Sequence, residues 1–154
     1  MRVLFVCLGN ICRSPTAEGV LRHKLLHAGL AEQVEVASAG TSDWHVGKPP
    51  DARSQRAALA RGYDLSAQRG QQARREDFAR YDLILAMDQS NLRNLKALQP
   101  AGAKAELDLF LRRYEGAVDE VPDPYYDGDQ GFEQVLDLIE QACDRLVIEL
   151  KGRL

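Results

Sequence analysis

The sequence lacks a long apolar run, a cysteine framework and an obvious targeting segment. No apolar run approaches the roughly 18 residues that a membrane-crossing helix needs. The stretch from Met1 to Cys7 is too short for a signal peptide and has no small-residue cleavage site. Three cysteines, two of them only five positions apart, do not suit a disulfide framework. These absences predict a cytoplasmic protein with no membrane association.

The sequence also has no internal repeat and no low-complexity tract. Its 154 residues predict a single domain, spanning residues 1–154, whose core needs no disulfide or metal to hold it. The formal net charge is only −3, with a basic first half and an acidic second half. No long basic stripe appears, so nucleic acid is not an expected partner. The three cysteines and three scattered histidines do not form a spaced ligand set, so neither a metal nor a cofactor is predicted.

Short apolar runs alternate with helical patterns along the chain. The runs at 3–6 and 82–86 are typical of strands buried on both faces, and 34–38 and 105–109 are further strand candidates. Strands that alternate with helices favour a parallel sheet covered on both sides. Ligands of such sheets bind where the first strand passes to its helix.

Four helices are expected from capping residues and apolar periodicity. Ser14 is predicted to cap the first, with Pro15 at its first position and Gly29 after its end. Asp51 is predicted to cap a helix that reaches about residue 61, and Asp88 one that Pro100 closes. The last covers 132–150, where the periodicity predicts a buried Cys143.

The segment from Cys7 to Pro15 carries the chemical signal. It joins a predicted strand to a predicted helix, so its backbone N–H groups and the helix dipole converge on one anion site. Gly9 and Asn10 tolerate the left-handed backbone angles of a tight cradle. Arg13 can grip two phosphate oxygens with its planar fork. No Gly-Lys-Ser/Thr follows, so this is not a Walker-type loop.

Cys7 lies at the centre of this expected positive field. Helix N-termini and nearby cations favour a reactive thiolate in such places, and no histidine base is then required. The hydroxyl of Ser14 is placed in sequence to donate to that sulfur. Cys-x5-Arg in this strand–loop–helix setting therefore predicts nucleophilic attack by Cys7 on a bound phosphate ester.

When a thiolate attacks a phosphate ester, the leaving oxygen departs more easily with a proton, and an acidic segment near residue 120 can supply one. Asp123 is the candidate because Pro122 and Pro124 restrict its loop. Four other acidic residues leave the choice open on these grounds alone: Asp119, Glu120, Asp127 and Asp129. Their spacing does not fit a calcium loop, which requires a Glu at the twelfth position.

With these features the chain resembles the low-molecular-weight protein tyrosine phosphatases over nearly its whole length. The resemblance rests on Val3–Pro15 and on shorter matches at 39–44, 87–88, 90–92 and 123–126. It implies an α/β fold with a four-stranded parallel sheet, flanked by helices on both faces, and a phosphate-binding loop between the first strand and first helix. It also implies metal-independent hydrolysis of phosphotyrosine and small aryl phosphates through a phosphocysteine intermediate. In that reaction Cys7 is the nucleophile, Arg13 the phosphate clamp and Asp123 the general acid.

The resemblance implies roles for further residues. The phosphate-binding loop comprises Leu8, Gly9, Asn10, Ile11, Cys12, Arg13 and Ser14. The support of that loop by hydrogen bonds falls to Asn10, Ser14, Ser38 and Asp88. Trp44, Tyr125 and Tyr126 form the substrate rim, where aromatic rings can flank a phenyl group. Cys7 and Cys12 can close a reversible disulfide that protects the nucleophile from irreversible oxidation, while a buried structural role for Cys12 stays open.

The implied partners are phosphotyrosine proteins or peptides, a tyrosine kinase that supplies them, and inorganic phosphate as product. One departure from the family is that Gln68 and Gln71 stand where many relatives have His and Arg. Two alternatives remain: an arsenate reductase on the same scaffold, and a non-catalytic phosphotyrosine-binding module. The first lacks an evident third reactive cysteine, and the second has no need of both Cys7 and Asp123.

Overall fold

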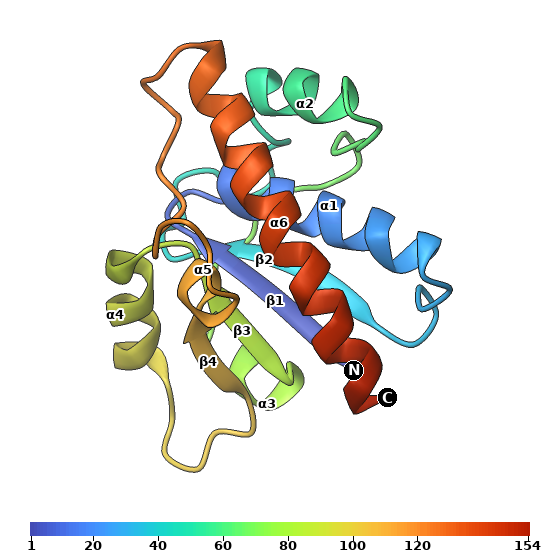
Figure 1. The fold of residues 1–154 in the computed structure, drawn as a ribbon. Helices are drawn as coiled ribbons and strands as arrows, with labels where there is room; N and C mark the ends of the chain where they lie inside the picture. The colour runs from blue at the N-terminus through green and yellow to red at the C-terminus, as the bar shows by residue number, and fades with distance from the viewer.

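Four parallel strands form the centre of the molecule. In the computed structural model, which describes residues 1–154, they are β1 (Arg2–Cys7), β2 (Glu35–Gly40), β3 (Leu83–Ala86) and β4 (Glu106–Leu109). Their order in the sheet is β2-β1-β3-β4, so β1 lies between its two neighbours (Figure 1). The α/β class and the four-stranded parallel sheet predicted from the sequence are thus confirmed. From β1 the chain adds β2 on one side of the sheet, and then β3 and β4 on the other side. A ligand site is therefore expected at the carboxyl end of β1, where the strand order changes direction.

Six helices connect and cover these strands. They are α1 (Arg13–His27), α2 (Ala52–Leu59), α3 (Asp77–Arg80), α4 (Gln89–Leu98), α5 (Phe110–Arg113) and α6 (Asp129–Arg153). The four helices expected from the sequence are present, and α6 extends three residues beyond the predicted range at each end. The helices α3 and α5 were not predicted, because one turn is too short to show a periodic pattern. None of the helices combines the length and apolarity needed to cross a bilayer.

The sheet is buried on both faces. Val3 and Phe5 of β1 belong to a core that includes apolar residues of α1 and α6, which pack against each other. Leu4 and Val6 point to the opposite face, into a smaller core with residues of α3 and α4. Because successive side chains of a strand alternate between faces, a strand covered on both sides is apolar throughout.

Helix capping follows the sequence at two of three predicted positions. Asp51 and Asp88 cap α2 and α4, and each side chain accepts hydrogen bonds from backbone N–H groups of its helix. Ser14 does not cap α1, so that prediction was wrong. The helix begins two residues earlier than predicted, at Arg13, and the Ser14 hydroxyl lies beside the Cys7 sulfur, the other position that the sequence predicts for it. The Ser14 hydroxyl, which sequence statistics assign to the start of a helix, instead contacts the sulfur of Cys7.

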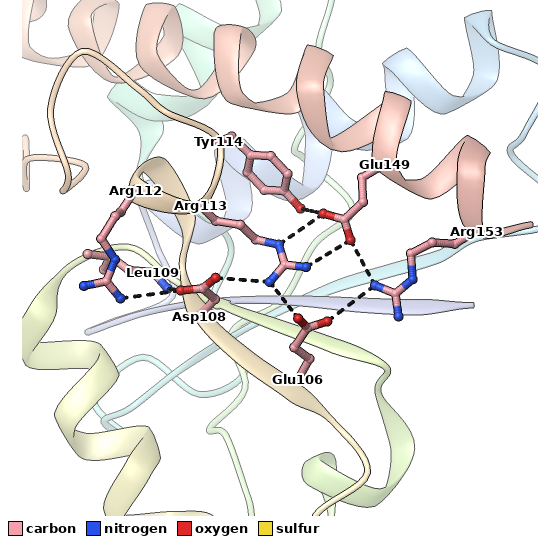
Figure 2. A network of polar contacts seen from close by, with 8 residues as sticks. All are labelled: Glu106, Asp108, Leu109, Arg112, Arg113, Tyr114, Glu149 and Arg153. Atoms are coloured by element: carbon pink, nitrogen blue, oxygen red, sulfur yellow. Dashed lines mark hydrogen bonds and ion pairs between the residues drawn. The ribbon is translucent and has the colours of Figure 1, made fainter.

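An ion-pair network fastens α6 to β4 and α5 (Figure 2). Arg113 contacts Glu149 through Nε and Nη2 at 3.1 and 3.0 Å, and its Nη1 lies 3.1 Å from carboxylate oxygens of both Glu106 and Asp108. The hydroxyl of Tyr114 donates to Glu149 at 2.9 Å. Partial burial opposes ionisation of Glu149, but these donors outweigh it and lower the pKa of Glu149 to about 2. The network thus joins α6 to the consecutive elements β4 and α5.

Candidate active site

The segment from Cys7 to Arg13 forms a tight loop between β1 and α1. Asn10 has a left-handed backbone conformation, with φ of +57°, as its sequence predicts. Gly9 does not have a positive φ, so the prediction of left-handed geometry there was wrong. What favours glycine at this position is space, because a Cβ on Gly9 would lie 3.1 Å from Cδ2 of His45. The loop thus requires one strained backbone residue and one small residue.

The sulfur of Cys7 has two hydrogen-bonding neighbours inside this loop. Its Sγ lies 3.0 Å from Oγ of Ser14 and accepts from the backbone N–H of Asn10 at 3.3 Å. Ser14 is fully buried and itself accepts a hydrogen bond from Nδ2 of Asn10 at 2.8 Å. The Ser14 proton is therefore available to Cys7, or to the carbonyl of Ala39 at 3.3 Å. Both neighbours can present hydrogen to the sulfur.

A chain of side-chain hydrogen bonds continues from Asn10 away from the sulfur. Its Nδ2 donates to Oγ of Ser38 at 3.0 Å, and Ser38 donates to Oε1 of Glu18 at 2.8 Å. Glu18 is only 6% exposed, and burial raises its pKa against the opposing effects of Arg22 and Ser38. Sequence reasoning missed Glu18, because a Glu in the first turns of a helix is usually solvated. Because the Glu18 side chain accepts the hydrogen bond that Ser38 donates, the lone pairs of the Ser38 oxygen remain available to accept a hydrogen bond from Asn10.

The two glutamines that depart from the family pattern both contact this region. Gln71 donates from its backbone N–H to Oδ1 of Asn10 at 3.0 Å and from Nε2 to the carbonyl of Ser38 at 2.9 Å. Gln68 donates from Nε2 to the carbonyl of Pro15 at 3.0 Å. The backbone of Gln71 thus holds the loop at Asn10, while the two amide side chains bond the main chain of β2 and of α1 beside the loop.

Arg13 lies beneath the loop and is 3% exposed. Its Nη1 donates to Oδ2 of Asp88 at 2.7 Å and to the carbonyl of Val121 at 3.1 Å, and its Nη2 lies 3.6 Å from Oδ2 of Asp123. Burial opposes the charge, but Cys7 and Asp88 outweigh it and raise the pKa of Arg13. The guanidinium is a permanent cation that is held by contacts from two separate segments, one at Asp88 and one at Val121 and Asp123.

A cavity of about 220 Å³ opens above the loop. Its floor and walls come from the loop, the segment after β2 and the segment before α6: Cys7, Leu8, Gly9, Ile11, Cys12, Arg13, Trp44, His45, Asp123, Tyr125 and Tyr126. Of the five acidic candidates, Asp123 is the one that lines it. Its Oδ1 accepts from the backbone N–H of Tyr125 at 3.1 Å. Trp44 is 66% exposed and Tyr126 95% exposed, so both lie at the mouth.

Helix α2 supports the loop from behind, which the sequence did not reveal. The backbone N–H of Asp51 donates to the carbonyl of Ile11 at 2.8 Å.

Burial raises the pKa of Cys12 to about 12, although its contact with Ser54 has the opposite effect. Cys12 therefore stays a protonated thiol at neutral pH. Cys143 is fully buried in α6, as its sequence predicts, and does not line the cavity.

These features define a class of protein. A parallel α/β sheet delivers a cysteine at the end of its central strand, a compact loop follows, and a buried arginine opens the next helix. Loops of this form at a strand–helix crossover suit the binding of a small oxyanion.

Comparison with known proteins identifies the family. The model of the low molecular weight phosphotyrosine protein phosphatases matches residues 2–153, and the chain belongs to this family of hydrolases. A relative from Synechocystis sp. is 47% identical over 152 residues, which cover 97% of this chain and 96% of the relative.

Solved structures agree with this assignment. A protein tyrosine phosphatase from Entamoeba histolytica, crystallised with Hepes in its active site, is 38% identical and superposes with a TM-score of 0.94 over 100% of this chain and 99% of its own. A Drosophila arginine phosphatase is 33% identical, with a TM-score of 0.91 and 98% coverage of both chains.

Proposed function

We propose that this chain hydrolyses phosphate monoesters of phenols, above all phosphotyrosine in proteins or peptides, through a phosphocysteine intermediate. The observation that carries the proposal is that Cys7 and Arg13, at the two ends of one loop, line the same cavity as Asp123, which comes far later in the sequence. Each residue has the chemistry of one required part: a nucleophile, a cation for the phosphoryl oxygens and a proton donor. Their meeting in one place is not required by folding alone.

In the first step the Cys7 sulfur attacks phosphorus and the bond between phosphorus and the phenolic oxygen breaks. Asp123 donates its proton to the leaving oxygen, so that a phenol departs in place of a phenolate. Arg13 and the backbone N–H groups of residues 8–14 bind the remaining phosphoryl oxygens as their charge redistributes. The ion pair between Arg13 and Asp88 keeps the guanidinium oriented for this contact.

In the second step a water molecule attacks the phosphocysteine. The Asp123 carboxylate accepts a proton from that water, the sulfur–phosphorus bond breaks and inorganic phosphate is released. The Ser14 hydroxyl, 3.0 Å from the sulfur, donates to the departing thiolate. Donation at this point stabilises the leaving group, in the role that Asp123 has for the phenol in the first step.

The cavity walls favour an aromatic leaving group over a guanidinium. Leu8, Ile11, Trp44, Tyr125 and Tyr126 offer apolar and aromatic surface, which suits a phenyl ring. Asp123 is the one carboxylate in the lining, and the proposed reaction uses it as an acid. The similarity to an arginine phosphatase makes the comparison of phosphotyrosine and phosphoarginine peptides informative. We expect kcat/KM to be higher for phosphotyrosine.

Oxidation is a second event that the loop supports. Peroxide converts the Cys7 thiolate to a sulfenic acid; the Cys12 thiol then displaces water to form a disulfide, which external thiols reduce. The raised pKa of Cys12 means that its proton leaves as the bond forms. We expect peroxide inactivation to be reversed by dithiothreitol, and recovery to be smaller in Cys12→Ser.

The proposed chemistry also bears on where the protein acts and on the source of its substrate. A nucleophilic Cys7 works only as a reduced thiol, which supports a cytoplasmic location. The phosphotyrosine it consumes must come from a tyrosine kinase.

The proposal is tested by assaying p-nitrophenyl phosphate hydrolysis in EDTA beside arsenate-dependent thiol oxidation. We expect metal-independent hydrolysis and no arsenate reduction, since Cys143 is fully buried and no third cysteine lines the cavity. Arsenate reduction without ester hydrolysis would favour the reductase alternative. Phosphotyrosine binding without either reaction would favour the binding module.

A further inference from the structure

An arginine from α2 contacts the aromatic wall of the cavity from outside the cavity lining. The guanidinium carbon of Arg53 lies over the ring of Tyr125, 5.3 Å from its centroid, and over the ring of Phe132 at 4.9 Å. Tyr125 lines the cavity and Phe132 is buried at the start of α6. Arg53 therefore connects a partly exposed aromatic ring, that of Tyr125, to a buried one, that of Phe132.

A carboxylate fixes the direction of Arg53. Its Nε and Nη2 donate to Oδ1 and Oδ2 of Asp51 at 3.2 and 3.0 Å, in a two-point contact that only a planar guanidinium can make. Asp51 is itself fixed, because its side chain caps α2 and its backbone N–H donates to the carbonyl of Ile11. The hydrogen bonds from Arg53 lower the pKa of Asp51 despite its partial burial, so this pair stays ionised at neutral pH.

The ring of Tyr125 has one further aromatic contact. Its ring contacts Tyr126, at 4.9 Å between centroids, but Tyr126 is 95% exposed. Of these two ring neighbours, Arg53 is the one that is held in place, through its two hydrogen bonds to Asp51. Asp51 and Arg53 thus link the phosphate-binding loop at Ile11 to the aromatic wall at Tyr125.

We propose that Arg53 is a positioning residue that sets the orientation of Tyr125 and thereby the affinity for the aromatic part of the substrate. The inference rests on the proposed function in that it assigns the aryl group to this wall. Arg53 does not line the cavity, so it acts through Tyr125 and not by touching the substrate. It should therefore affect aryl recognition and leave oxyanion binding unchanged.

The test compares Arg53→Lys with wild type by calorimetric binding and by steady-state kinetics. Lysine keeps the positive charge but loses the two-point contact and the planar stacking surface. We expect about three- to tenfold weaker binding of benzylphosphonate and a similar rise in KM for p-nitrophenyl phosphate. Binding of inorganic phosphate and kcat should stay within about twofold of wild type.

Arg56→Lys is the matched control. Arg56 lies on the same helix, is exposed and has no contact with Tyr125, so its substitution should change neither ligand. Thermal unfolding of each variant separates local misplacement from loss of fold. If Arg53→Lys does not fold, Arg53→Gln, which keeps a planar donor group, takes its place.

A double-mutant cycle gives the decisive readout. In a Tyr125→Ala background the Arg53→Lys substitution should have no further effect on benzylphosphonate affinity, because its target is gone. An equal effect in both backgrounds would overturn the inference and show that Arg53 acts through Phe132 and general stability. Wild-type benzylphosphonate affinity in Arg53→Lys would also overturn it.

Failure of this inference is distinguishable from failure of the proposed function. If wild type hydrolyses no aryl phosphate but Arg53→Lys still weakens benzylphosphonate binding selectively, the proposed function fails and the positioning role stands. If hydrolysis is normal and benzylphosphonate binds both proteins equally, the positioning role alone is rejected.

Discussion

Asp88 both caps α4 and accepts a hydrogen bond from Arg13 at 2.7 Å, across 75 positions of sequence. One of its oxygens accepts from the backbone N–H of Asn91, and the other from the guanidinium. The start of α4 is thus joined to the cation of the phosphate-binding loop through a single carboxylate.

The two contacts of Asp88 can be separated by mutation. We expect Asp88→Ala to lose about 1 kcal/mol of stability with the cap and to lower kcat/KM for p-nitrophenyl phosphate about tenfold, because Arg13 loses its orienting partner. Asn91→Ala is the control, since it removes the reciprocal contact of the capping box without touching Arg13. Equal activity losses in the two variants would contradict an orienting role for Asp88.

Replacing the proposed nucleophile should separate binding from chemistry. We expect Cys7→Ser to abolish hydrolysis of p-nitrophenyl phosphate while phosphate and vanadate still bind, because Arg13 and the loop amides remain. Cys143→Ala, which alters a buried cysteine outside the cavity, should hydrolyse p-nitrophenyl phosphate as fast as wild type. Normal hydrolysis by Cys7→Ser would exclude this sulfur as the nucleophile.

The assignment of the acid predicts a dependence on the leaving group. Asp123→Asn should slow phenyl phosphate far more than p-nitrophenyl phosphate, since a good leaving group departs without a proton. Asp127→Asn, an exposed neighbour outside the cavity lining, should behave as wild type with both substrates. A rate loss of the same size for both esters would reject Asp123 as the acid.

The network around Arg113 predicts acid sensitivity. Because the pKa of Glu149 falls from 4.5 to about 2 on folding, its stabilisation is complete above pH 4.5 and disappears as the pH drops toward 2. Allowing for solvent screening of a quarter-exposed side chain, the contribution is on the order of 1–2 kcal/mol. Urea unfolding of wild type and Glu149→Gln should therefore show a stability difference at neutral pH that shrinks through this window.

Glu32→Gln is the matched control for that measurement, because Glu32 is exposed and has no ion-pair partner. Its stability difference from wild type should be near zero at every pH. A difference for Glu149→Gln that stays constant down to pH 2 would show that the carboxylate charge does not matter there.

Local signals in the sequence predicted the strands, the four longer helices and the position of the loop. The apolar run of β1 and the aspartates at 51 and 88 act on their immediate neighbours, so pattern and capping rules suffice. Helix statistics wrongly assigned Ser14 to a cap, whereas its position in the loop sequence correctly predicted that its hydroxyl lies beside the Cys7 sulfur. The contacts of Glu18, Gln71 and Arg53 were not predictable, because they depend on elements brought together by the tertiary fold.

The ion-pair network of Arg113 and Glu149 also includes Glu106, the first residue of β4, and therefore reaches the amino edge of the sheet. Cys7 ends β1 at the opposite edge. This ionic network and the catalytic cysteine therefore lie at opposite edges of the sheet. Selection or protein engineering can therefore adjust the acid tolerance of this enzyme through Glu149 and its partners, none of which lines the catalytic pocket.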